Sequence, residues 1–149
     1  MSTDENDEHF CGEWVIEGQL ARCHRPGRRH PSYGSGPVPI KIVEEWVGKV
    51  RNLGIRSIIC LLRDCQLKLY AEVVGGSLVD YYRTAGFEVA HVPSTNHEPL
   101  SPTNLDNVWR EFQRLPKPVL VHCSYGNTRS RSATEHIVAC LNGHLEARG

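Results

Sequence analysis

The sequence lacks a long apolar run, a net charge and a recognisable targeting segment. No hydrophobic stretch approaches the roughly 20 residues that a transmembrane helix needs. The 17 basic residues balance the 17 acidic ones, so bulk electrostatics gives no reason to expect binding to a membrane or to nucleic acid. The first residues are acidic and polar, without the basic and apolar regions of a signal peptide. We therefore expect a mobile acidic tail over residues 1–12 and a cytoplasmic protein.

Cysteine occurs six times, but no two cysteines have the CxxC spacing. Zinc sites often show that spacing, so we expect no metal site, although eight histidines are available as ligands. In the cytoplasm the cysteines should mostly be free thiols. Cys60 and Cys65 lie in or just after a predicted strand, where either could approach Cys123 as a disulfide partner or both could be ordinary thiols.

Residues 13–149 show neither an internal repeat nor a linker, and the length suits a single domain with a buried core. Short apolar runs alternate with segments of helical periodicity, which favours an α/β fold with a central, mainly parallel sheet flanked by helices. The last helix carries Ala133, Ile137, Val138 and Leu141 at core spacing. The predicted strands lie within Glu13–Arg22, Arg56–Leu62, Phe87–Val92 and Pro118–His122. The other predicted helices lie at about 39–54, 77–86 and 101–115.

The segment HCSYGNTRS (His122–Ser130) lies between a predicted buried strand and the last helix. Ligands of open α/β sheets bind beyond the carboxyl ends of the strands. Inward-turned backbone amides and the positive end of the helix can hold a tetrahedral dianion there. The same positive field should lower the pKa of Cys123 and make its thiolate a nucleophile. The predicted phosphate-binding residues are Ser124, Tyr125, Gly126, Asn127, Thr128 and Arg129.

A buried structural cysteine is the alternative for Cys123 taken alone, but its neighbours favour function. The pattern of His122 and Cys123, five further residues, then Arg129 and Ser130 resembles the signature of the cysteine-dependent protein tyrosine phosphatases. The small size resembles the dual-specificity branch. The segments WVIEGQLAR and QLKLYAEVVGGSLVDYYRTAGFEVAHVP resemble parts of the kinase-associated phosphatase-like group. This resemblance covers about Trp14 to Leu141 and implies a phosphotyrosine-phosphatase-like fold.

The resemblance also implies a role for each residue of the signature. Cys123 attacks phosphorus and forms a phosphocysteine, and Arg129 binds the equatorial phosphate oxygens. The Ser130 hydroxyl hydrogen-bonds the sulfur and helps it leave in the second step. His122 positions the loop and tunes the thiolate without acting as a base. No metal or other cofactor is required.

The acid that such a mechanism needs is missing from its expected position. In the family, an aspartate after a Pro-x-x segment protonates the leaving oxygen, which is worth roughly 10²–10⁴ in rate. The corresponding residue here is Asn96, which cannot give up a proton. Three possibilities follow: the chain is a slow enzyme with the acid replaced by its isostere, His97 or Glu98 takes over, or the domain binds phosphate with little turnover.

Several charged residues outside the signature remain open between a solvated and a functional role. Arg131 replaces a residue that is usually small in the family, and either faces solvent or contacts substrate. Asp64, after a strand end, is a further candidate acid. A basic loop could border the pocket and contact a second phosphate or an acidic partner, although a solvated loop is the simpler interpretation. Its arginines are Arg22, Arg25, Arg28 and Arg29.

The sequence leaves the substrate class undecided. A phosphatase of phosphotyrosine, phosphoserine or phosphothreonine in proteins is the first interpretation, with a phosphorylated protein or small molecule as partner. A phosphatase of non-protein phosphates, such as RNA 5′ ends, inositol phosphates or phosphoinositides, is the second, and a phosphate-binding module is the third. A rhodanese-like sulfurtransferase also places a cysteine loop between strand and helix, but the Arg129 spacing and Ser130 favour phosphate.

Overall fold

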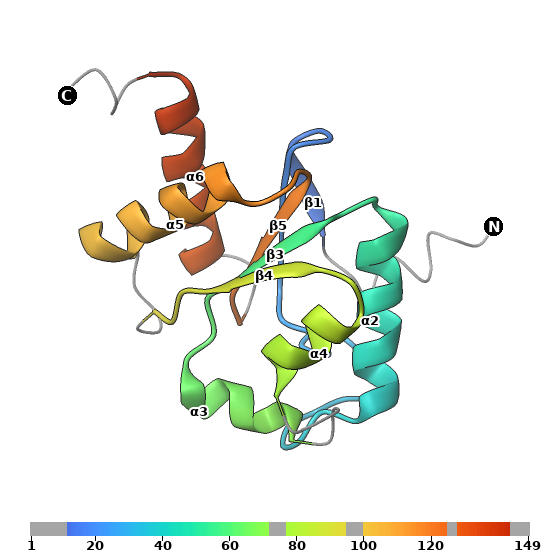
Figure 1. Cartoon of the computed structure of the whole chain (residues 1–149). Helices are drawn as coiled ribbons and strands as arrows, with labels where there is room; N and C mark the ends of the chain where they lie inside the picture. Colours follow the sequence, from blue (N-terminus) through green and yellow to red (C-terminus); the bar gives the residue numbers. More distant parts are fainter. Residues whose placement is uncertain (1–11, 72–76, 95–99, 125–127, 144–149) are drawn as a thin grey trace.

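The computed structural model describes residues 12–71, 77–94, 100–124 and 128–143, and its centre is a five-stranded sheet in the order β1-β2-β5-β3-β4 (Figure 1). β1 pairs antiparallel with β2, and every other neighbouring pair is parallel. The predicted α/β architecture is therefore confirmed. The strands are β1 (Glu13–Ile16), β2 (Leu20–Cys23), β3 (Ser57–Cys60), β4 (Glu88–His91) and β5 (Val119–His122).

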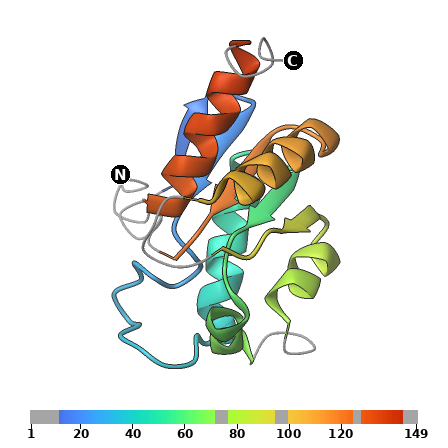
Figure 2. The ribbon, with the colours of Figure 1, turned by 90° about the vertical axis from the view of Figure 1, so that its left-hand side faces the viewer.

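Helices cover both faces of the sheet, as Figures 1 and 2 show. One hydrophobic cluster joins one face of the sheet to α2 and α4, and a second joins the opposite face to α5 and α6. Two short helical segments, α3 and η1, follow β3. The helices are α2 (Ile40–Asn52), α3 (Asp64–Leu67), η1 (Lys68–Tyr70), α4 (Leu78–Thr84), α5 (Pro102–Arg114) and α6 (Thr128–Leu141).

The inner strands β3 and β5 are apolar on both faces because helices lie on both sides of them. Successive side chains of a strand point to opposite faces. Leu120 accordingly belongs to the cluster under α2 and α4, while Val119 and Val121 belong to the cluster under α5 and α6. All three side chains have no exposed surface. Burial on both sides explains why these strands appear in the sequence as short continuous apolar runs.

The predicted start of α5 and the predicted end of α2 agree with the structure. Ser101 precedes α5, and its hydroxyl accepts a hydrogen bond of 3.2 Å from the backbone N–H of Asn104. Pro102 occupies the first turn, where its missing N–H does no harm. Gly54 follows α2 with a φ of 85°, a left-handed conformation that glycine adopts without strain.

The sequence was misleading at the end of α6. Ala133 and Ile137 are buried as predicted, and Val138 is partly buried, but Leu141 is 49% exposed. Figure 2 shows that the last turn of α6 extends beyond the sheet. Helical spacing identifies which face points inward, but it does not say how far the neighbouring elements reach.

One predicted segment lies outside the described residues, and one short helix was not predicted. The predicted acidic tail, residues 1–12, lies outside the described residues except for Gly12. The short helix α3 was not predicted, because four residues are too few to show an apolar period. No helix among the described residues combines the length and apolar character needed to cross a membrane.

Candidate active site

The predicted site lies at the carboxyl ends of the three inner strands. His122, the last residue of β5, is paired in register with Cys23 of β2 and with Cys60 of β3. Cys123 follows at once, and α6 begins at Thr128. The loop that carries Cys123 therefore starts from the middle of the sheet, where ligands of open α/β folds bind.

Cys123 and Arg129 are both buried at this point, with exposed fractions of 2% and 4%. Burial lowers the pKa of Arg129, while the negative charge of the Cys123 sulfur and a hydrogen bond with it act in the opposite direction. The positive charge of Arg63 also lowers the pKa of Arg129. The structure thus brings together the predicted nucleophile and the predicted phosphate-binding guanidinium.

Arg129 is held in place by neutral oxygen atoms from neighbouring segments. Its Nη1 lies 3.3 Å from the Ser94 hydroxyl and 3.4 Å from the Ser94 carbonyl oxygen. The same nitrogen lies 3.5 Å from both the Leu61 carbonyl and the Gln66 side-chain oxygen. These are long hydrogen bonds to uncharged partners. They orient the guanidinium without neutralising its charge, so the positive charge is available to an anion.

His122 has no exposed surface, and burial lowers its pKa to about 3. It is therefore neutral near pH 7. Its Nδ1 lies 3.4 Å from the Cys123 carbonyl oxygen, and its Nε2 lies 3.0 Å from the Tyr82 hydroxyl. A neutral, buried and doubly hydrogen-bonded ring suits the predicted positioning role and not that of a base in the reaction.

Arg25 is more buried than the sequence indicated. A solvated basic loop was the simpler expectation, but Arg25 is only 8% exposed. Its backbone N–H donates to the Ser124 carbonyl at 3.1 Å, and its Nε donates to the Ser124 hydroxyl at 3.4 Å. Arg29 is exposed and Arg28 is half-buried, while Arg22 pairs with Glu13 on β1.

The remaining predicted residues occupy varied positions around the loop. Ser130 is fully buried in the first turn of α6. Thr128 and Arg131 are exposed. Asp64 is exposed at the first position of α3. Residues 95–99, with Asn96, His97 and Glu98, and residues 125–127, with Tyr125, Gly126 and Asn127, lie outside the described part of the chain.

The two cysteines considered as disulfide partners differ in environment. Cys60 has no exposed surface, and burial raises the pKa of its thiol to about 12. A thiol that stays protonated is a poor attacking group. Cys65 is exposed on α3. Among the described residues, no group of three or more His, Cys, Asp or Glu side chains is arranged to hold a metal ion.

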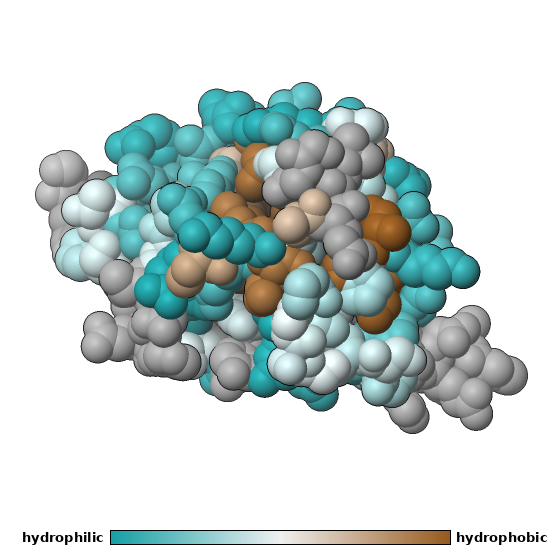
Figure 3. All heavy atoms as spheres, turned by 90° about the horizontal axis from the view of Figure 1, so that it is seen from below, coloured by the Kyte–Doolittle hydropathy of each residue, from teal (hydrophilic) through white to brown (hydrophobic). Residues whose placement is uncertain are grey.

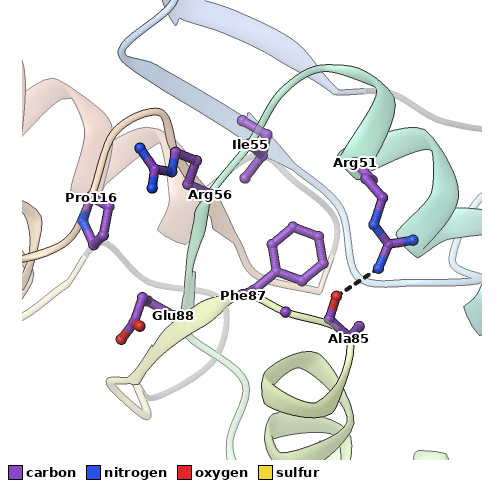
Figure 4. Close-up of a pocket in the computed structure, with 8 residues that line it drawn as sticks. Arg51, Ile55, Arg56, Ala85, Phe87, Glu88 and Pro116 are labelled. Atoms are coloured by element: carbon purple, nitrogen blue, oxygen red, sulfur yellow. Dashed lines mark hydrogen bonds between the residues drawn. The ribbon is translucent and has the colours of Figure 1, made fainter.

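A cavity of about 220 Å³ lies at the other end of the sheet (Figure 4). Arg56 and Glu88, which line it, flank the amino ends of β3 and β4, whereas Cys123 follows a carboxyl end. Arg51 turns its guanidinium to the Ala85 carbonyl at 2.7 Å. This cavity is therefore separate from the predicted phosphate site.

The face seen from below Figure 1 carries apolar side chains in its middle, with hydrophilic side chains around them (Figure 3). α3 and the lower end of α2 lie at the bottom of Figure 1, so this face includes the segment that follows β3. Gln66 of that segment contacts Arg129. This face thus combines polar and apolar surface.

No protein-family model matches the chain, and no curated protein matches it significantly. Solved structures do. The kinase-associated phosphatase KAP, with its catalytic cysteine replaced by serine, is 19% identical with a TM-score of 0.64, over 82% of this chain and 65% of KAP. The active form of Tk-PTP is 22% identical with a TM-score of 0.61, over 89% of this chain and 74% of Tk-PTP. These likenesses confirm the predicted phosphotyrosine-phosphatase-like fold.

Proposed function

We propose, because the chain has the fold of the cysteine-dependent phosphatases, that it hydrolyses phosphate monoesters through a phosphocysteine intermediate. The observation that carries this proposal is the burial of Cys123 beside the guanidinium of Arg129, at the junction of β5 and α6. A nucleophile next to a fixed cation, at a helix N-terminus, is the arrangement that attack on a phosphate dianion requires.

Two displacements at phosphorus make up the reaction. In the first, the Cys123 sulfur forms a bond to phosphorus while the bond to the ester oxygen breaks, and that oxygen leaves with the bonding electrons. In the second, water attacks phosphorus and passes a proton to solvent, and the sulfur leaves as a thiolate with the electrons of the phosphorus–sulfur bond. Arg129 stabilises the charge on the equatorial oxygens in both steps. Ser130, fully buried one residue later, stabilises the departing sulfur.

Protonation of the leaving oxygen is the step for which this chain lacks the usual acid. With Asn96 at the position of the acid, that oxygen departs as an anion or takes its proton from water, so aryl esters react much faster than alkyl esters. We propose phosphotyrosine in proteins as the physiological substrate class, with phosphoserine and phosphothreonine turned over more slowly, in the cytoplasm. A panel of phosphopeptides, phosphoinositides, inositol phosphates and RNA 5′-phosphates tests this preference.

The Cys123→Ser variant tests the function itself. It should lose hydrolysis of p-nitrophenyl phosphate by roughly 10³-fold or more, since a serine hydroxyl is a far weaker nucleophile than a thiolate. Binding of inorganic phosphate should survive, because the loop and Arg129 remain. Cys65→Ser, which removes an exposed thiol outside the loop, is the matched control and should retain activity. Equal turnover in the wild type and in Cys123→Ser contradicts the proposal.

A further inference from the structure

The side chain of Arg25 supports the predicted phosphate loop from outside the signature. Arg25 lies in the loop after β2, the strand next to β5 in the sheet. It bonds to Ser124 twice, from its backbone N–H to the carbonyl oxygen and from Nε to the hydroxyl. Ser124 is the residue immediately after Cys123, and it is itself only 6% exposed. Both contacts therefore act next to the nucleophile.

Two tyrosine rings hold the Arg25 guanidinium in place. Its carbon lies 5.5 Å from the ring centre of Tyr33 and 6.0 Å from that of Tyr70, within the range of cation–π contacts. Its Nη1 donates to the Tyr70 hydroxyl at 3.0 Å, and that hydroxyl donates to the Pro26 carbonyl at 2.6 Å. Burial lowers the pKa of Arg25, but the two tyrosines outweigh burial and raise it. The side chain is thus a fixed cation.

Neither Arg25 nor Arg129 forms an ion pair with an acidic side chain in the part of the chain that the structure describes. A buried cation without a counter-charge is costly to keep in a folded protein. Two such cations contact one loop. Arg25 bonds to Ser124, and Arg129 forms a hydrogen bond with Cys123. An anion held by that loop supplies the charge that both lack.

We propose that Arg25 is a positioning residue of the phosphate site, which fixes Ser124 beside Cys123 and whose charge is balanced by the thiolate and the bound phosphate. This role rests on the proposed function and deepens it. Arg129 comes from α6 and Arg25 from the loop after β2, so the two guanidinium groups reach the anion loop from different segments. The site would then use two arginines, one that binds the anion and one that fixes Ser124, and only the first belongs to the signature.

Other charged and titratable groups also face this region. Arg63, after β3, acts on Arg129, and Arg28 and Arg29 act on His24. Burial above all, and the nearby arginines to a smaller extent, lower the pKa of His24 to about 4, so that ring is neutral near pH 7. A test of Arg25 must therefore separate its specific contacts from the general positive charge of the loop.

The test compares Arg25→Gln and Arg25→Lys with the wild type. Two quantities are measured: the affinity for inorganic vanadate, and the rate at which iodoacetamide alkylates Cys123 as a function of pH. Arg25→Gln should weaken vanadate binding by roughly 10-fold or more, because it removes a charged hydrogen-bond donor. It should also move the alkylation profile to higher pH. Arg25→Lys should restore the alkylation profile, because it keeps the charge, but not the full affinity.

Arg29→Gln is the matched control, since it removes the same charge from an exposed position of the same loop. An effect of Arg29→Gln as large as that of Arg25→Gln overturns the positioning role. An unchanged vanadate affinity and alkylation profile in Arg25→Gln, with only a lower melting temperature, also overturns it. If Arg25→Gln does not fold, Ser124→Ala removes the side-chain contact alone. It should weaken vanadate binding by a smaller factor, and unaltered binding in that variant counts against the role.

Alkylation does not depend on turnover, so the two proposals fail separately. A protein that hydrolyses no phosphate ester, but whose Cys123 reactivity responds specifically to Arg25, loses the proposed function and keeps the positioning role. If the wild type and the Arg25→Gln variant hydrolyse aryl phosphates equally well and bind vanadate equally tightly, the function stands and the positioning role is lost.

Discussion

The hydroxyl of Tyr82 and the Nε2 atom of His122 meet inside the core at 3.0 Å. The other ring nitrogen of His122 faces the Cys123 carbonyl, which can only accept a hydrogen bond. A neutral imidazole has one N–H, so Nδ1 is the donor to the carbonyl and Nε2 accepts from Tyr82. The His122 and Trp46 rings also meet in a T-shaped arrangement at a centroid distance of 5.4 Å. Contacts in the core therefore orient the residue that precedes the proposed nucleophile.

Removing the Tyr82 hydroxyl should destabilise the protein. Tyr82→Phe leaves Nε2 of His122 buried without its donor, which should cost about 1–3 kcal/mol of unfolding free energy. Urea denaturation near pH 7 measures this cost. Tyr81→Phe, on the same helix but less buried, is the control and should change stability much less. Equal effects of the two variants would mean that the Tyr82 contact contributes nothing specific.

Lowering the pH should destabilise the fold through two buried histidines. Burial lowers the pKa of His24 to about 4 and of His122 to about 3, from an ordinary value of 6.5. Below pH 6.5 the unfolded chain therefore binds protons that the folded protein does not. The contribution of the two neutral histidines to the unfolding free energy is complete above that pH, and it falls as the pH is lowered towards 4. Each unit of pKa corresponds to about 1.4 kcal/mol.

Denaturation curves between pH 7 and pH 4 measure this slope. His24→Gln removes one of the two groups and should flatten the slope in that window. A wild-type stability that stays constant over the window contradicts the burial of neutral histidines.

Gly27 should resist substitution more strongly than another glycine of the same conformation. Its φ is 88°, and a Cβ atom there would lie 2.9 Å from a methyl carbon of Val38. Gly18 has a φ of 76° with open space around it. Alanine at either position carries a backbone cost of roughly 1–2 kcal/mol, and Gly27→Ala adds the collision. Thermal unfolding of the two variants isolates the steric part, and a smaller loss in Gly27→Ala would contradict the contact.

Asn96→Asp should restore a general acid. We expect kcat to rise by something on the order of 10²-fold, with a larger gain for alkyl than for nitrophenyl phosphates, because poor leaving groups need the proton most. The pH optimum should become acidic to neutral, since the carboxyl must be protonated while Cys123 is ionised. His97→Ala and Glu98→Gln are the companion variants. If Asn96→Asp changes nothing and one of these cuts the rate a hundredfold, the acid lies elsewhere in that segment.

The predictable part of the site is local in sequence. Cys123, Arg129 and Ser130 lie in one strand-loop-helix unit, and their spacing alone predicts that they share a pocket. The contact between Arg25 and Ser124 joins residues 99 positions apart. No periodicity links them, and a loop rich in arginine, glycine and proline is usually solvated. Only the pairing of β2 with β5 brings that loop to the site.

The fold was predicted for the same kind of reason. Strands buried on both faces have a continuous apolar pattern, and helix starts such as Ser101 have capping residues, so both are visible in a short window of sequence. Leu141 shows the limit, because its exposure depends on how far separate elements extend and not on its own helix.

Cys23, His122 and Cys60 lie side by side on three neighbouring strands. The candidate site is therefore attached to the centre of the sheet and not to an edge. The Leu61 N–H donates to the His122 carbonyl at 3.0 Å, and the Arg25 N–H donates to the Ser124 carbonyl at 3.1 Å. The segments after β3 and β2 are therefore bonded to the residues on either side of Cys123. These amides cannot exchange with solvent by fraying at an edge, and should exchange as slowly as the global opening of the domain allows. The backbone on either side of Cys123 should then be as rigid without an anion as with an anion bound.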